Sequence, residues 1–301
     1  MSDKVTAELR FECTGHSGPI YTICNGIEPG TLFSGGSDKV VACWSTLTGK
    51  QTGLTVKTDA PVFSICTIPE ANLLLIGLNT GSVHVVDIAS RKELKHLKYH
   101  TTSVFDIVYD ALKKLIYTCD ASGNLVITNA EDFSHMASFP HGEVRIRDLH
   151  LRDTTLFVAR GDGIISALET GNFNEIYQIR AHENGCNTIV TDTTGSVYSG
   201  GKDAWLKKWD IEKYIHGWPA HTSGIYDLVM AQNNTLLVSA SRDKMIKCWD
   251  PATLDPLLRI DRKTHKGHSH SVNKLAWEPG SQLLWSAGDD RRILGWDLRI
   301  S

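Results

Sequence analysis

The chain has 301 residues, of which 41% are hydrophobic, and 31 Lys and Arg against 34 Asp and Glu give a formal net charge of −3. This near-neutral charge excludes a generally basic nucleic-acid binder, and no apolar run reaches the roughly 18 residues that span a membrane. The seven cysteines form no C-x-x-C pair and the first residues hold no apolar secretion segment, so we expect a cytoplasmic protein without a disulfide framework.

The first predicted element is a strand at residues 5–12, where apolar and polar residues alternate. A pattern then repeats seven times, with Trp or its replacement at positions 44, 86, 128, 168, 209, 249 and 296, a period of about 42 residues. The repeat units cover about residues 13–56, 57–98, 99–139, 140–180, 181–219, 220–262 and 263–301. Because these units account for nearly the whole chain, we predict a single domain over residues 1–301.

Each unit divides into short runs that are typical of strands. In the sixth unit, residues 224–230, 235–239 and 245–249 are rich in β-branched and aromatic residues, and polar turns at 233–234 and 242–244 separate them. Such punctuation, without any long helical period, predicts antiparallel β-structure throughout.

Four units share a set of polar residues at a fixed spacing. In each set a His lies upstream, a Ser precedes an Asp by four residues, and the Asp precedes a Trp by six. The four sets are His16, Ser34, Asp38 and Trp44; His182, Ser199, Asp203 and Trp209; His221, Ser239, Asp243 and Trp249; and His268, Ser286, Asp290 and Trp296. Units two, three and four lack the complete set, and we expect them to depend on apolar packing alone.

The Gly-His dipeptides at 15–16 and 267–268, the Trp-Asp dipeptides and the period together give a sequence that resembles the WD40 family over residues 13–301. The resemblance implies an all-β, seven-bladed β-propeller whose blades are four-stranded antiparallel sheets around a central channel. It also implies that each polar set forms a buried structural relay, in which indole, hydroxyl, imidazole and carboxylate hydrogen-bond in turn.

The last unit has no room for a fourth strand, because only five residues follow Trp296. We therefore predict that the N-terminal strand at residues 5–12 becomes the outer strand of the last blade. This arrangement would leave the ring without an open edge.

A His, a Ser and an Asp in one unit would also suit a hydrolase. A catalytic triad occurs once and exposes its nucleophile, whereas this set recurs four times and no G-x-S-x-G turn is present. We therefore predict no catalytic residues and, since there is no P-loop, no cofactor. His265, His268 and His270 lie close together, but His268 belongs to a relay set and the loop is basic, so we predict no metal site.

The resemblance implies that partners are bound at the channel mouth by three positions in each unit: three and five residues after the His, and one before the turn Asp. In units two and four, which lack the His, these positions are placed through the following strand. They predict a partner-binding set of eight residues: Tyr21, Phe63, Phe105, Arg145, Arg147, Lys202, Tyr226 and Arg242. Four cations would favour an acidic or phosphorylated segment. As an alternative, the aromatic residues plug the narrow end of the channel.

The leading hypothesis is a non-catalytic scaffold that binds a protein or peptide across the mouth, as a monomer within a larger complex and away from membranes. The alternative is a propeller enzyme of the hydrolase or lyase type, with its site in the central channel. That alternative needs unmatched His, Asp or Glu at channel-lining positions, and we expect none. Nucleic-acid binding through the cations is a third hypothesis, which the net charge of −3 disfavours.

Overall fold

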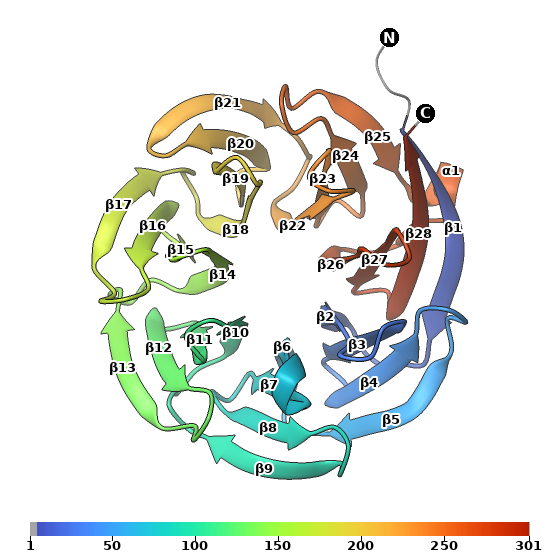
Figure 1. Cartoon of the computed structure of the whole chain (residues 1–301). Helices are drawn as coiled ribbons and strands as arrows, with labels where there is room; N and C mark the ends of the chain where they lie inside the picture. Colours follow the sequence, from blue (N-terminus) through green and yellow to red (C-terminus); the bar gives the residue numbers. More distant parts are fainter. Residues whose placement is uncertain (1–4, 301) are drawn as a thin grey trace.

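The computed structural model describes residues 5–300 and shows a ring of seven four-stranded antiparallel sheets (Figure 1). The predicted seven-bladed propeller is thereby confirmed. In six blades, four strands that are consecutive in the chain run from the channel to the rim, and the seventh blade combines the two ends of the chain.

The first four blades lie between residues 20 and 180. Blade one holds β2 (Ile20–Asn25), β3 (Thr31–Gly36), β4 (Val40–Ser45) and β5 (Gln51–Lys57). Blade two holds β6 (Val62–Ile68), β7 (Leu73–Leu78), β8 (Val83–Asp87) and β9 (Lys92–Leu97), with a short 3-10 turn, η1 (Pro69–Ala71), between the first two. Blade three holds β10 (Val104–Asp110), β11 (Leu115–Asp120), β12 (Asn124–Asn129) and β13 (His135–Pro140). Blade four holds β14 (Ile146–Arg152), β15 (Thr155–Arg160), β16 (Ile164–Glu169) and β17 (Glu175–Arg180).

The other three blades complete the ring. Blade five holds β18 (Cys186–Thr191), β19 (Ser196–Gly201), β20 (Trp205–Asp210) and β21 (Lys213–Pro219). Blade six holds β22 (Ile225–Ala231), β23 (Leu236–Ser241), β24 (Ile246–Trp249) and β25 (Pro256–Ile260). Blade seven holds β26 (Val272–Glu278), β27 (Leu283–Gly288), β28 (Arg292–Ile300) and β1 (Val5–Thr14), and the short helix α1 (Arg262–His265) precedes it. None of the helices formed by residues 5–300 has the length and apolar character needed to cross a bilayer.

The hydrophobic core lies between neighbouring blades. Second strands such as β7 and β23 are buried along their whole length, whereas the outer strand β17 is mostly exposed. One cluster, for example, joins Val238 and Ile246 of blade six to Leu275 of blade seven. Small residues allow this close approach: a Cβ added at Gly35 would lie 2.5 Å from Cγ1 of Val62 in the next blade.

The turn between the second and third strands has the same backbone shape in all seven blades. One residue of each turn lies in the left-handed region: Lys39, Gly81, Gly123, Gly163, Ala204, Lys244 and Arg291, with φ between 63° and 93°. In blades two to four this residue is glycine, which adopts that region without strain. In the other four blades it follows the relay Asp, whose carboxylate accepts backbone N–H groups, as Asp243 does from Met245 at 3.1 Å.

Blade seven closes the ring through both ends of the chain, as predicted. Strand β1 pairs antiparallel with β28, with Val5 opposite Ile300 and Thr14 opposite Arg292, so the strand is slightly longer than the expected 5–12. The ring of Phe11 stacks on Trp285 at 5.8 Å between centroids. In Figure 1, β1 lies on the outer edge of this blade beside β28.

Candidate binding site at the channel mouth

Each of the four predicted polar sets forms a hydrogen-bonded relay. In blade six, Trp249 Nε1 donates to Ser239 Oγ at 2.8 Å, the same Oγ lies 2.8 Å from His221 Nε2, and His221 Nδ1 lies 2.9 Å from Asp243 Oδ2. With Nδ1–H donated to the carboxylate, Nε2 accepts the serine O–H, so every group of the relay is satisfied. The corresponding distances in blades one, five and seven lie between 2.7 and 2.9 Å.

The relay serines are sealed inside the blades. Ser34, Ser199, Ser239 and Ser286 each have 0% of their surface exposed, so a substrate has no access to their hydroxyl oxygens. Burial raises the pKa of the Asp290 carboxyl, but hydrogen bonds and charge from His268, with the Ser269 N–H, outweigh it and hold the pKa well below its usual range. The pKa values of Asp203 and Asp243 are lowered by the same balance.

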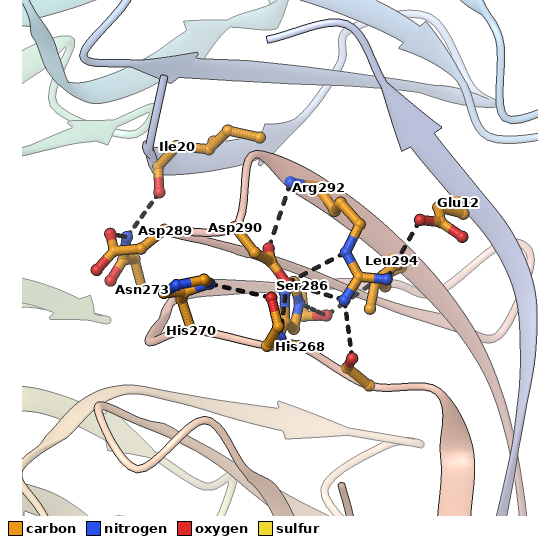
Figure 2. Close-up of polar contacts among 12 residues, drawn as sticks. Glu12, Ile20, His268, His270, Asn273, Ser286, Asp289, Asp290, Arg292 and Leu294 are labelled. Atoms are coloured by element: carbon orange, nitrogen blue, oxygen red, sulfur yellow. Dashed lines mark hydrogen bonds and ion pairs between the residues drawn. The ribbon is translucent and has the colours of Figure 1, made fainter. Parts of the chain in front are cut away.

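In blade seven the relay is tied to the closing strand (Figure 2). The Arg292 guanidinium donates to Asp290 Oδ2 and to the Gly267 carbonyl, at 2.9 and 2.8 Å, and reaches Glu12 on β1 at 3.2 Å. The Asp that orients the relay His is therefore linked through one Arg to the N-terminal strand.

Blade three corrects one expectation. His100 Nε2 lies 2.7 Å from Thr118 Oγ1 and His100 Nδ1 lies 2.9 Å from Asp120 Oδ2, so this blade has a three-membered relay without a Trp. The Asp stands at the end of β11, two residues before the turn position that Ser122 occupies. Our expectation that unit three depends on apolar packing alone was wrong, because a carboxylate displaced by two residues still reaches the imidazole.

The eight predicted partner-binding residues come together around two adjoining cavities at the end of the channel. The first cavity, of about 280 Å³, is lined by Tyr21, Phe63, Phe105, Arg147 and Tyr226. The second, of about 360 Å³, is lined by Arg145, Arg147, Lys202, Tyr226 and Arg242. Arg147 and Tyr226 belong to both cavities, so the aromatic part and the cationic part form one continuous surface, which we call the mouth.

A β-bulge in each innermost strand explains how these side chains are presented. Register partners skip one residue near the start of the strand, for example Tyr21 between Ile20 and Thr22. The skipped residues of the seven blades are Tyr21, Phe63, Phe105, Arg147, Asn187, Tyr226 and Asn273. A bulged residue is released from the ladder and its side chain is redirected, here to the mouth. Phe63 and Arg147 are thus the true equivalents of Tyr21, although their units lack the His.

The aromatic half of the mouth is preorganised. Tyr21 and Phe63 stack at 4.9 Å between ring centroids, Phe63 meets Phe105 edge-on at 5.8 Å, and the Arg147 guanidinium lies 4.5 Å above the Phe105 ring. Burial, and then the charge of Arg145, lower the pKa of Arg147. A guanidinium held on a ring loses little further freedom when it binds an anion.

The cationic half of the mouth has no internal counter-charge. Arg145, Lys202 and Arg242 are exposed, and no carboxylate lines their cavity. Lys274, deeper in the channel, pairs with Asp227 at 2.9 Å, whereas within residues 5–300 no carboxylate lies in ion-pair range of Arg145, Arg147, Lys202 or Arg242.

The channel below the mouth corrects a second expectation. Asp106, Asp148 and Asp227 follow the bulged residues of blades three, four and six, and Lys274 holds the same place in blade seven, so acidic groups do line the channel. In the blades that have the His, these residues lie six positions after it, one beyond the position from which the mouth was predicted. Burial, and then the charge of Asp148, raise the pKa of Asp106 to about 7; burial raises the pKa of Asp227 to about 6.

These carboxylates also join the blades. Asp106 accepts the Leu149 N–H of the next blade at 2.9 Å, Asp148 accepts that of Ile189 at 2.8 Å, and Asp227 accepts that of Leu275 at 2.7 Å. Each therefore has a structural role in holding one inner strand against the next.

A ring of seven blades with buried relays and an open mouth is a β-propeller, a fold class typical of protein-interaction scaffolds. The family model of the WD domain, G-beta repeat matches residues 7–45, 212–250 and 261–297. The chain therefore carries WD40 repeats, set in a ring of seven blades that share the same turn, and four of these blades have the full relay.

Relatives resemble the chain over different lengths. Over 130 residues it is 33% identical to nuclear distribution protein nudF 1 of Talaromyces marneffei, a match that covers 40% of this chain and 27% of the relative. Over 287 residues it is 26% identical to the kinesin-like protein KIF21B of Homo sapiens, covering 91% of this chain and 16% of the relative. The chain thus spans about a quarter or less of the length of these relatives.

Proposed function

We propose that this protein is a non-catalytic interaction scaffold that binds an acidic or phosphorylated segment of a partner protein across the mouth. The observation that carries the proposal is the group of four cations without counter-ions beside an aromatic surface. We further propose that it acts in the cytoplasm as a monomer within a larger complex.

The chemistry of the mouth favours an anionic ligand with an apolar neighbour. Arg145, Arg147 and Arg242 can each offer a planar guanidinium to a phosphate or carboxylate, and Lys202 adds a mobile charge. The stacked rings of Tyr21 and Phe63 give an apolar side chain a rigid surface to pack on. A segment with an acidic or phosphorylated residue near an apolar one would use both halves.

A binding assay with matched charge reversals tests this proposal. Peptides that differ only in a phosphoserine, a Glu or a Ser would be titrated against the wild type and against Arg242→Glu. We expect the variant to bind the anionic peptides more than tenfold more weakly, with its melting temperature nearly unchanged. Arg180→Glu, on the exposed outer strand β17, makes the same charge change away from the mouth and serves as the control.

Two results would argue against the proposal. One is equal affinity for the phosphorylated and the unphosphorylated peptide. The other is a loss in Arg242→Glu that Arg180→Glu reproduces, since a general loss of positive charge would then explain it.

A channel enzyme is the second candidate, and the raised pKa of Asp106 favours it, because such a carboxyl can act as a general acid or base near neutral pH. Against this candidate, Asp106 already accepts the Leu149 N–H. The test is to assay both the wild type and Asp106→Asn with a panel of hydrolase and lyase substrates. Turnover by the wild type but not by the variant would favour the enzyme, and turnover by neither protein would favour the scaffold.

A further inference from the structure

A second group of titratable side chains belongs to β8 and β9, the two strands of blade two that lie farthest from the channel in Figure 1. His84 on β8 and His96 on β9 are direct cross-strand partners, and their imidazole rings stack with centroids 4.3 Å apart. Nδ1 of His84 lies 3.1 Å from Oε1 of Glu93. One nitrogen or oxygen from each of the three side chains lies within 4.8 Å of the others.

A β-bulge puts the Glu on the same face as the two histidines. Residues 93 and 96 are three apart, so in a regular strand their side chains would point to opposite faces. The register between β8 and β9 shifts so that Leu94 has no partner and Glu93 pairs with Val86. Since His84 and Val86 share a face, Glu93 is brought beside His84 and His96.

The surroundings of His84 complete the arrangement. Its Nε2 is buried, has no hydrogen-bond partner within residues 5–300, and faces Asp59 Oδ1 at 3.9 Å. At that distance the two atoms are not hydrogen-bonded, but a small rotation of the exposed Asp59 side chain would let it accept the Nε2–H, as carboxylates commonly do from metal-binding imidazoles. A cavity of about 440 Å³ between blades one and two, lined by Asp59, His84 and Glu93, leaves room for an ion and water.

From this geometry we propose that His84, Glu93 and His96 bind a zinc ion, with Asp59 orienting His84. Two ligand atoms each about 2.0–2.1 Å from a tetrahedral zinc are about 3.3 Å apart, close to the 3.1 Å between His84 Nδ1 and Glu93 Oε1. Lys57 and Arg91 line the same cavity and balance the negative charge of Asp59 and Glu93. The two imidazoles, rather than a net negative charge, therefore determine which metal ion is bound. Two nitrogens and one oxygen suit zinc rather than magnesium or calcium, which prefer oxygen ligands.

The proposed ion would stabilise a blade that lacks a relay His. It would tie the mostly exposed edge strand β9 to β8, which is largely buried. The bulge that unites the three residues is not visible in their spacing, so the sequence alone predicted no metal site.

Zinc titration of the full chain without a histidine tag tests the proposal. In competition with a chromogenic chelator, we expect one zinc per chain and a melting temperature that rises with zinc concentration. His96→Ala and His84→Ala should each weaken zinc binding at least about 100-fold, and Asp59→Asn about tenfold. His135→Ala, an exposed histidine on β13, should leave the affinity unchanged.

Circular dichroism in the presence of a chelator would verify that each variant is folded, and His96 is exposed enough for its replacement to be tolerated. The proposal is overturned if the wild type binds no zinc at about 100 µM, or if His84→Ala and His96→Ala bind it as tightly as the wild type does.

Discussion

Replacing Ser239 by Ala removes the oxygen at the centre of the blade-six relay. That oxygen accepts the Trp249 indole N–H and contacts His221 Nε2, both at 2.8 Å, and its side chain has 0% of its surface exposed. Water therefore cannot replace it, and two buried polar groups are left without partners.

The expected cost follows from those two groups. A buried donor or acceptor that loses its partner costs about 1–3 kcal/mol, so we expect Ser239→Ala, which leaves two such groups, to lower the free energy of unfolding by about 2–6 kcal/mol. In a chain of this size, about 2 °C of melting temperature corresponds to each kcal/mol, which gives a decrease of about 4–12 °C.

Ser166 of blade four supplies a matched control. It is equally buried, but its hydroxyl has no hydrogen-bond partner within residues 5–300. Ser166→Ala should therefore be neutral or stabilising by about 1 kcal/mol. Urea denaturation and calorimetry of the two variants check this. If both substitutions lowered stability equally, or if Ser239→Ala changed nothing, the relay would not be the structural element described above.

Three further predictions follow from the fold. Deleting residues 1–12 should destabilise the whole ring, because β28 and Trp285 lose their cover; an unchanged melting temperature would refute closure by β1. Amide hydrogen exchange should be faster in blades two and four, which have no relay His, than in blade six; uniform protection would contradict this. The pKa of Asp106 is about 7 in the folded protein and about 3.9 in the unfolded chain, so between these pH values the folded state binds more protons than the unfolded state. The free energy of unfolding should therefore fall as the pH rises from about 3.9 to 7, by at most about 1.4 kcal/mol per pH unit. Asp106→Asn should therefore be more stable than the wild type at pH 8 and lose that advantage near pH 4, as urea titrations at several pH values would show.

Much of the fold could be predicted because the repeat carries it. The four full relays and the alternation at residues 5–12 are local patterns whose spacing is the same in each copy, and the structure has them as expected. The positions of the mouth could be predicted for a related reason: the bulged residue is the second residue of the innermost strand in every blade, even where the His is missing, as at Phe63 and Arg147.

The features that sequence missed depend on contacts that spacing does not encode. Asp120 replaces the turn carboxylate from a different position, because the imidazole of His100 can be reached from either place. Asp106 and Asp148 lie one residue beyond the bulge, where side chain and neighbouring backbone belong to different blades. Blade-to-blade contacts of this kind become visible only once the ring is assembled.

A charge-swap cycle tests the central claim that the mouth recognises an anion. An acidic peptide selected by the wild type would be measured with its acidic residue kept or replaced by Arg, against the wild type and against Arg242→Glu. If the mouth holds that acidic residue, the Arg peptide should bind the variant better than the acidic peptide does, with a coupling energy of at least about 1.5 kcal/mol. Losses that add to within about 0.5 kcal/mol would show that the two residues do not meet, and would contradict the account.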